Sequence, residues 1–170
     1  MPAYVALLRA VNVGGTGKLP MTELAAMCVA EKFENVRTYI ASGNVVFSSR
    51  HPEAKVKAAL EKRLHAFAGK PVGVIVRTAD ELAAVVAANP FDTLPANSTV
   101  AIFLDEAPPP DTLEHVRGQN GEVIRLGKRE IYVAYGAGMG RSKLKIRAAA
   151  AGTARNINTV TKLAELAAAL

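Results

Sequence analysis

The sequence predicts an α/β protein, an α+β sandwich made of two βαββαβ-type halves packed together with an extra C-terminal helix. Short apolar runs of the kind that form buried strands alternate along the chain with longer segments of helical periodicity. Half of the 170 residues are hydrophobic and 21% are charged, so a sizeable core can form. These observations fit one large domain or two small halves.

The first half has the element order of a split βαβ unit. Short apolar runs bounded by turn residues predict strands at residues 3–9, 36–40, 45–49 and 72–77. One helix is expected from Pro20 to about Phe33. Another follows His51 and carries an apolar stripe at helical spacing, made of Val56, Leu60, Leu64 and Phe67. This order predicts a ferredoxin-like half over residues 1–78.

The second half, residues 79–170, predicts a less regular version of the same order with the extra helix at its end. Thr78 and Glu81 have the spacing of a capping box, which predicts a short helix to about Ala88. Strands are expected at residues 99–104, 123–126 and 131–135, and helices at 111–117, from about 141, and at 159–169. The two halves share an element order but no repeated sequence, so we expect a duplicated architecture without a detectable sequence repeat.

The net charge of +6 is unevenly distributed. Residues 1–116 hold 11 basic and 12 acidic side chains, whereas residues 117–170 hold 10 basic and 3 acidic. A basic end of the chain can attract phosphates, acidic partners or nucleic acid. A solvated basic face explains the same excess at least as well. Because Trp is absent and aromatic residues make up 5%, base stacking on a single strand is disfavoured.

Cysteine and histidine usage predicts neither a disulfide nor a metal site. Cys28 is the only cysteine and lies in an apolar helical pattern, so we interpret it as a core residue. The three histidines fall in separate predicted elements without ligand spacing: His51, His65 and His115. Residues 1–10 enter a strand without a leader-like pattern, and no apolar run approaches the roughly 20 residues of a membrane span. We therefore expect a cytoplasmic protein without a membrane partner.

A glycine-rich loop after the first strand is the first candidate binding site. Its residues that suit an anion are Arg9, Asn12, Gly14, Gly15 and Lys18, just before a predicted helix start. The standard phosphate loop needs a glycine at position 12 and a hydroxyl at position 19, where this chain has Asn and Leu. A generic anion-binding turn remains possible, and so does a glycine-rich connection without a ligand.

A second strand, glycine loop and expected helix start bring Arg141, Ser142 and Lys143 together. We interpret Ser142 as the cap of that helix and not as a nucleophile, because no His or Asp lies near it in the sequence. Lys145 and Arg147 extend the basic character. On a helix, basic residues two positions apart spread around the axis, which disfavours a single groove-binding stripe.

Two further polar stretches are candidates for binding. Ser42, Gly43 and Asn44 are typical of a tight hairpin turn, whether or not they also bind. Arg155 and Asn156 precede the final helix, which Asn158 or Thr159 is expected to cap. A guanidinium beside an amide suits a carboxylate or phosphate, but the arginine equally suits fastening the helix to the body of the protein.

Four stretches, in order and spacing, resemble a bacterial family known as domain of unknown function 1697. They are LLRAVNVGG at residues 7–15, RTYIASGNVVF at 37–47, GRSKL at 140–144 and TARNINTV at 153–160. The resemblance covers essentially the whole chain and implies two related ferredoxin-like halves, but no activity. It also implies glycine at position 10 and tryptophan at position 157, where this chain has Ala10 and Ile157.

Three functions remain open from the sequence. The four stretches could converge on one phosphate-bearing ligand, such as a nucleotide or a nucleic-acid backbone. The same pocket could serve an enzyme of unnamed reaction and cofactor, for which Lys18, Lys143 and Tyr39 are the candidate acid or base groups. Alternatively, the polar residues could be internal fasteners of a protein that acts through another surface. The sequence assigns neither a catalytic residue nor an oligomeric state.

Overall fold

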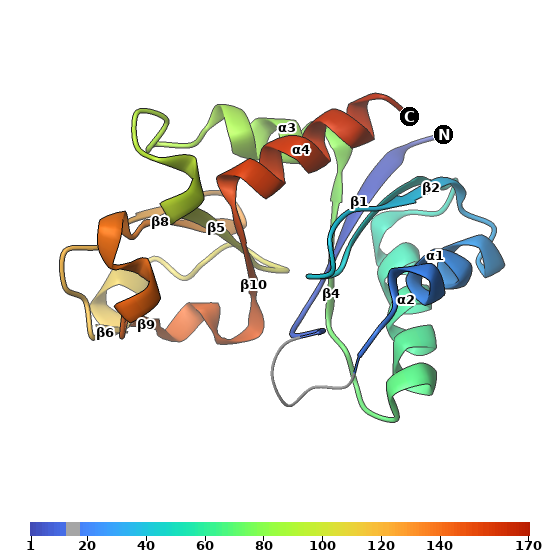
Figure 1. Cartoon of the computed structure of the whole chain (residues 1–170), viewed down its shortest axis with the longest axis horizontal. Coiled ribbons are helices and arrows are strands. Elements are labelled where there is room, and N and C mark those ends of the chain that lie inside the picture. Colours follow the sequence, from blue (N-terminus) through green and yellow to red (C-terminus); the bar gives the residue numbers. More distant parts are fainter. Residues whose placement is uncertain (13–17) are drawn as a thin grey trace. The chain divides into compact units, whose positions relative to one another are not determined.

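The structure is a computed structural model that describes residues 1–12 and 18–170 (Figure 1). This described part holds two four-stranded antiparallel sheets, four α-helices and a two-stranded ribbon. The predicted α/β class is therefore confirmed, including the C-terminal helix. The chain forms two compact units, one of Met1–Ala83 with Leu163–Leu170 and the other of Ala84–Lys162. The predicted division between residues 78 and 79 stays a prediction.

The first sheet has the strand order β2-β3-β1-β4, and its elements follow one another as predicted. The strands are β1 Ala3–Leu8, β2 Glu34–Thr38, β3 Asn44–Ser48 and β4 Val74–Thr78. The helices α1 Met21–Ala30 and α2 Glu53–Ala68 connect them and lie on one face of the sheet (Figure 1). β1 is central because it pairs with both β3 and β4.

The core of this unit follows from two periodicities. Alternate residues of β1, Tyr4, Ala6 and Leu8, point to the same face and join the buried cluster. The stripe of α2 meets that face, because Val56, Leu60 and Leu64 are buried in the same cluster. Phe67, the last member of the predicted stripe, is instead 46% exposed, since it lies near the end of the helix.

The second sheet has the order β10-β5-β8-β7. Its strands are β5 Thr99–Phe103, β7 Val123–Leu126, β8 Glu130–Ala134 and β10 Thr153–Asn156. A ribbon of β6 Val116–Arg117 and β9 Lys145–Ile146 contributes Ile146 to the core on one face of this sheet. The short helix α3 Ala79–Ala87 precedes this sheet in the chain, and α4 Ile157–Ala168 follows it.

Two local predictions in the second half are wrong. Residues Thr112–His115 form a 3₁₀ turn followed by β6, not a helix over 111–117. Gly136–Arg141 is also a 3₁₀ turn, and the chain then becomes extended into β9 instead of starting a helix. In both cases tertiary packing overrides the weak local preference for a helix. The polar stretch that begins at Thr153, for which no element was predicted, is the edge strand β10.

None of the helices described for this chain has both the length and the apolar composition needed to cross a bilayer.

The predicted capping box is confirmed and gives the first testable prediction. The amide of Glu81 donates to Thr78 Oγ1 over 3.1 Å, and the amide of Thr78 donates to Glu81 Oε1 over 2.9 Å. We expect Thr78→Ala to lower the free energy of unfolding by about 1 kcal/mol, because a helix-end amide loses its acceptor. Urea denaturation measures this, with Thr93→Ala, at an exposed turn, as the control. Equal effects of the two substitutions would contradict the role of the cap.

Candidate functional site

The chain leaving β1 is held by the turns on both sides of it. The amide of Leu8 donates to the carbonyl of Gly43 over 2.9 Å, and the amide of Arg9 donates to the carbonyl of Gly73, also over 2.9 Å. Gly73 lies against the Arg9 side chain, since a Cβ there would be 3.0 Å from Arg9 Cδ. The first predicted motif therefore begins at a fixed place, between the turn after β2 and the segment before β4.

Asn12 acts as a fastener within this region. Its Oδ1 accepts from the amide of Leu19 over 2.6 Å, and its Nδ2 donates to the carbonyl of Leu19 over 2.9 Å. The same Nδ2 donates to the carbonyl of Ala41 over 2.8 Å. The amide group thus joins the two described ends of the glycine-rich segment to the turn between β2 and β3. Gly14 and Gly15, also predicted here, lie outside the described residues.

The Ser42–Gly43–Asn44 turn packs directly against the segment that follows β1. Gly43 has φ +92°, and a Cβ there would be 2.6 Å from Val11 Cγ2 and 2.9 Å from Leu8 Cβ. Asn44 is buried, and its Nδ2 donates to the carbonyl of Tyr39 and to Ser42 Oγ, each over 2.9 Å. The structure therefore brings the first two predicted motifs together, and it gives Gly43 and Asn44 structural roles.

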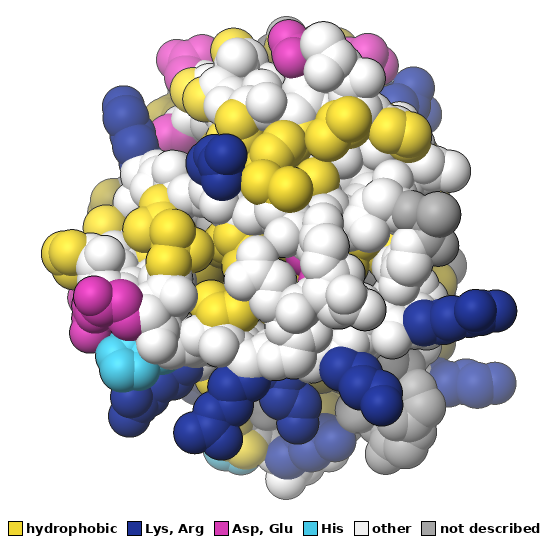
Figure 2. Space-filling view, turned by 90° about the vertical axis from the view of Figure 1, so that its left-hand side faces the viewer, with side chains coloured by type: hydrophobic (Ala, Val, Ile, Leu, Met, Phe, Trp, Pro, Cys, Tyr) yellow, Lys and Arg dark blue, Asp and Glu magenta, His cyan; other side chains and the backbone are white. Residues whose placement is uncertain are grey.

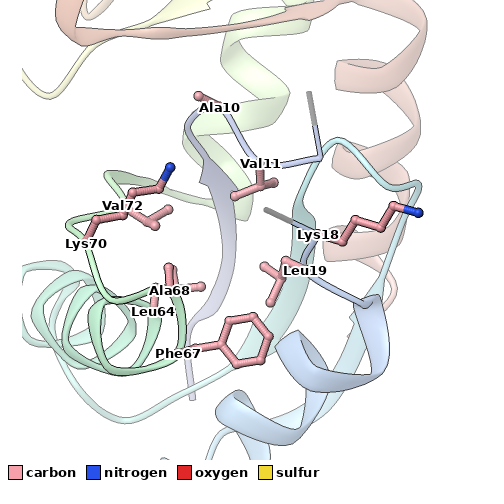
Figure 3. Close-up of a pocket in the computed structure, with 9 residues that line it drawn as sticks. All are labelled: Ala10, Val11, Lys18, Leu19, Leu64, Phe67, Ala68, Lys70 and Val72. Carbon is pink, nitrogen blue, oxygen red and sulfur yellow. The ribbon is translucent and has the colours of Figure 1, made fainter. Parts of the chain in front are cut away.

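A small cavity opens beside this region, within the first unit (Figure 3). Its volume is about 210 Å³. Most of its lining is apolar and comes from the chain after β1, from the end of α2 and from the segment before β4. These apolar residues are Ala10, Val11, Leu19, Leu64, Phe67, Ala68 and Val72.

Two lysines line the same cavity. Figure 3 shows Lys70 beside Val72, with its nitrogen directed toward Ala10, while Lys18 lies on the opposite side and extends away from the cavity. Both side chains are exposed, and among the described residues neither has an ion-pair or hydrogen-bond partner. Lys18 belongs to the predicted site. Lys70 does not, because a lysine between Gly69 and Pro71 is typical of a helix end and carries no signal for a ligand.

The third predicted motif lines a separate, polar cavity of about 550 Å³ in the second unit. Arg141, Ser142 and Lys143 contribute to it, together with Glu122 and Tyr135. Ser142 Oγ donates to the Glu122 carboxylate, which also accepts from the amide of Asn120. These two hydrogen bonds stabilise the charged carboxylate and hold the pKa of Glu122 below its usual value. The hydrogen bond from Ser142 has the larger effect. The predicted helix-capping role of Ser142 is therefore wrong.

The fourth predicted motif is largely internal. Arg155 is 7% exposed, and its Nη1 donates to Thr153 Oγ1 over 2.6 Å and to the carbonyl of Ala154 over 2.9 Å. Burial lowers the pKa of its guanidinium to about 10, which still leaves it charged at neutral pH. Asn156 Oδ1 accepts from the amide of Thr159 over 2.9 Å. Asn156 therefore caps α4, in place of the expected Asn158 or Thr159.

The other candidate residues with reactive or titratable side chains do not form a site in the described structure. Cys28 is fully buried, and burial raises the pKa of its thiol to about 12, which agrees with a core residue. Across residues 1–12 and 18–170, no three His, Cys, Asp or Glu side chains gather as metal ligands would. Of the three acid or base candidates, Lys18 and Lys143 line different cavities and the half-buried Tyr39 lines neither.

Sequence reasoning missed Phe67, Lys70 and Glu122 as residues of the two cavities. Phe67 has the spacing of a core residue, and only its position near the helix end could have suggested exposure. Glu122 carries no local signal, because its partner Ser142 lies 20 positions away and is brought to it by tertiary structure.

The chain is similar to known proteins both in its sequence and in its fold. The model of a family described as "Protein of unknown function (DUF1697)" matches residues 1–132. The chain belongs to the DUF1697 family. A solved structure of "conserved bacterial protein SP0830 from Streptococcus pneumoniae" superposes with a TM-score of 0.77 at 24% identity, over 97% of this chain and 98% of that one. This likeness shows a shared fold, and no curated protein matches.

Membership in DUF1697 gives the departure at position 10 a physical meaning. Ala10 has φ +49°, and Asn12 and Ile40, close to it in this region, have φ +54° and +51°. A left-handed conformation costs an L-residue about 1–2 kcal/mol, whereas glycine adopts it without that cost. The glycine that the resemblance implies at position 10 therefore suits this backbone better than alanine.

This strain gives the second prediction. We expect Ala10→Gly to raise the free energy of unfolding by about 0.5–1 kcal/mol, because relief of the left-handed strain exceeds the entropy that glycine adds to the unfolded chain. Ala58→Gly, at an exposed position inside α2, is the matched control and should lower the same quantity by about 0.5–1 kcal/mol. Urea denaturation of both variants tests this. A loss of stability in both would contradict it.

The third prediction concerns Glu122 and Ser142. Because the pKa of folded Glu122 is lowered, its charged form stabilises the fold above its unfolded pKa, and this stabilisation is lost as pH falls through the folded value. We expect Ser142→Ala to lower the melting temperature most near pH 7 and progressively less below about pH 4.5. Thermal unfolding from pH 3 to 8 measures the difference. In a Glu122→Gln background the effect should no longer vary with pH; if it still does, another group is responsible.

Proposed function

We propose that this DUF1697 protein is a binding module for a small organic anion, an acid with a compact apolar body, held in the cavity between the end of β1 and the end of α2. The observation that carries the proposal is the combination of an apolar lining with two lysines that have no partner among the described residues. The predicted convergence of all four motifs on a single ligand stays a prediction.

The apolar lining favours a ligand with an apolar body. Phe67 is 46% exposed beside the cavity, so a bound group would remove aromatic surface from water. Each Å² of apolar surface removed contributes about 25 cal/mol. Pockets for drug-sized ligands measure about 300–1,000 Å³. A cavity of about 210 Å³ therefore supports a ligand the size of a substituted benzene and not a whole nucleotide.

The lysines favour an acidic head group. An ammonium group is a compact charge that suits carboxylates and phosphates, and charge-assisted hydrogen bonds are about twice as strong as neutral ones. Lys57 on α2 provides a contrast, because its Nζ contacts Glu61 and the carbonyl of Val74. Lys70 has no such partner within the described chain and its nitrogen is directed toward Ala10, so it is available to an anion at the mouth of the cavity, whereas Lys18 extends away and adds positive charge at the rim.

The fasteners around the cavity support the same proposal. Asn12 and Gly43 hold the chain after β1 in one position, and this chain provides part of the cavity wall. A wall that is already fixed loses little conformational freedom when a ligand binds, which favours affinity. Of the predicted site residues, Lys18 thus lies at the rim of the cavity, whereas Asn12, Gly43 and Asn44 are assigned to support.

The proposal is tested with two acids and two comparison compounds, and this is the fourth prediction. Benzoate and phenyl phosphate should raise the melting temperature by about 3–6 °C at ten times their dissociation constant, whereas benzyl alcohol and inorganic phosphate should raise it far less. Calorimetric titration should show that Lys70→Gln weakens binding about five- to tenfold, because an ammonium partner of the acid is lost.

Lys62→Gln is the matched control, since Lys62 is exposed on α2 and does not line the cavity. It removes the same charge and should leave binding unchanged. The proposal is wrong if benzyl alcohol binds as well as benzoate, if Lys62→Gln weakens binding as much as Lys70→Gln, or if none of the four compounds binds.

A further inference from the structure

The segment 141–147 carries four exposed basic side chains at alternate positions, two beside or within β9 and two in the 3₁₀ turns that flank the extended chain. It runs extended from Ser142 (φ −65°, ψ 134°) through β9 to Ile146 (φ −112°, ψ 117°). Burial alternates along it as an extended chain requires. Ser142 and Leu144 are half-buried and Ile146 is buried, whereas the exposed positions are Arg141, Lys143, Lys145 and Arg147. The helix expected here would have dispersed these charges; the extended chain aligns them.

A fifth cation lies directly opposite this segment. In the antiparallel ribbon of β6 and β9, Arg117 is paired with Lys145 while Val116 is paired with Ile146. The two apolar partners face the core, so the two cations lie next to each other on the outer side. We call Arg117, Arg141, Lys143, Lys145 and Arg147 the basic stripe. Figure 2 shows Lys and Arg side chains gathered on the lower part of the face that carries this ribbon.

The charges of the basic stripe are not neutralised within the described structure. None of the five side chains has an ion-pair or hydrogen-bond partner among the described residues. Two carboxylates nearby are already engaged. Glu122 accepts from Ser142 and Asn120, and Asp111, which lines a hollow with Arg147, pairs with His115 over 3.1 Å. Like charges directly opposite each other on a ribbon are destabilising, so an external anion would be stabilising here.

The length of the basic stripe indicates what kind of anion fits. An extended chain rises about 3.3 Å per residue, so residues 142–146 span about 13 Å, and Arg141 and Arg147, in the 3₁₀ turns at the two ends, lengthen the line further. A single small anion cannot contact charges over this length, whereas a nucleic-acid duplex carries one phosphate charge per roughly 1.7 Å of its axis. None of the described aromatic residues belongs to the stripe, so base stacking is not part of the contact.

We propose that the basic stripe binds the phosphate backbone of a nucleic-acid duplex, without reading its sequence. This surface belongs to the second unit, Ala84–Lys162, and the proposal does not depend on the small-anion cavity of the first unit. Lysine and arginine bind phosphates in the two ways that suit a backbone, as a point charge and as a planar fork. The duplex is favoured over a single strand because its charge density is higher and the stripe itself contains no aromatic side chain.

The fifth prediction is the salt dependence of this binding. A labelled 20-base-pair duplex of mixed sequence is titrated with the protein and followed by fluorescence anisotropy from about 50 to 200 mM NaCl. With up to five phosphate contacts, the slope of log K against log salt should reach about −4.5, a loss of about 500-fold in affinity over this range. Lys143→Gln/Lys145→Gln should weaken binding about tenfold per lysine at the lowest salt and reduce the slope by about 2.

The matched control is Lys55→Gln/Lys62→Gln, which removes the same charge from exposed positions of α2. It should change the affinity and slope little. A single variant, Lys145→Glu, separates binding from folding. It should lose binding while its melting temperature stays the same or rises, because a glutamate opposite Arg117 replaces repulsion with attraction.

Four outcomes would overturn the proposal. The first is an equal loss with the α2 control, which would mean that overall charge and not the basic stripe binds the duplex. The second is absence of duplex binding at about 50 mM NaCl. The third is binding of phosphatidylserine vesicles, or of the single-stranded oligonucleotide, in preference to the duplex. The fourth is preserved duplex binding by a folded Lys145→Glu protein, which would exclude the ribbon as the contact.

Discussion

The exit of the central strand β1 constrains the whole first unit. Because β1 is paired on both sides within its sheet, the chain that leaves it must pass between two neighbouring turns, and it bonds to both within two residues, at Gly43 and Gly73. Backbone groups at such a site must find partners, and the close approach leaves no room for a Cβ at Gly43. The cavity between this exit and α2 is a consequence of that fixed geometry.

The secondary structure could be predicted from the sequence where local signals and tertiary packing agree. The strands and helices of residues 1–88 follow from apolar periodicity, and the Thr78–Glu81 capping box follows from spacing alone. In the second half, local signals and tertiary packing disagree. β9 and β10 are short and polar, so no local pattern predicts them; they form because pairing with β6 and β5 places Ile146 and Arg155 at buried positions. Pairing between distant residues cannot be read from a window of sequence.

The candidate site shows the same limit in chemical terms. Side chains with several hydrogen-bonding atoms are the natural candidates for binding when only the sequence is known. Amide and guanidinium groups have the most such atoms. Those groups are also good internal fasteners, because each can satisfy more than one polar atom at once, as Asn12, Asn44 and Arg155 do. At the cavity, the cations without a partner in the described part of the chain are Lys18 and Lys70. Their availability depends on what surrounds them, which residue type alone does not determine.

The basic stripe shows how a wrong secondary-structure prediction changes a functional conclusion. Two positions along a helix are about 200° apart around the axis, so basic residues at 141, 143, 145 and 147 would point in different directions. Two positions along a strand point the same way. The same four residues therefore form either a scattered surface charge or a line of charge, and only the pairing of β9 with β6 decides which. Pairing of β6 with β9 also places Arg117 opposite Lys145, a contact between like charges. Such a contact destabilises the ribbon, so it does not serve the stability of the fold.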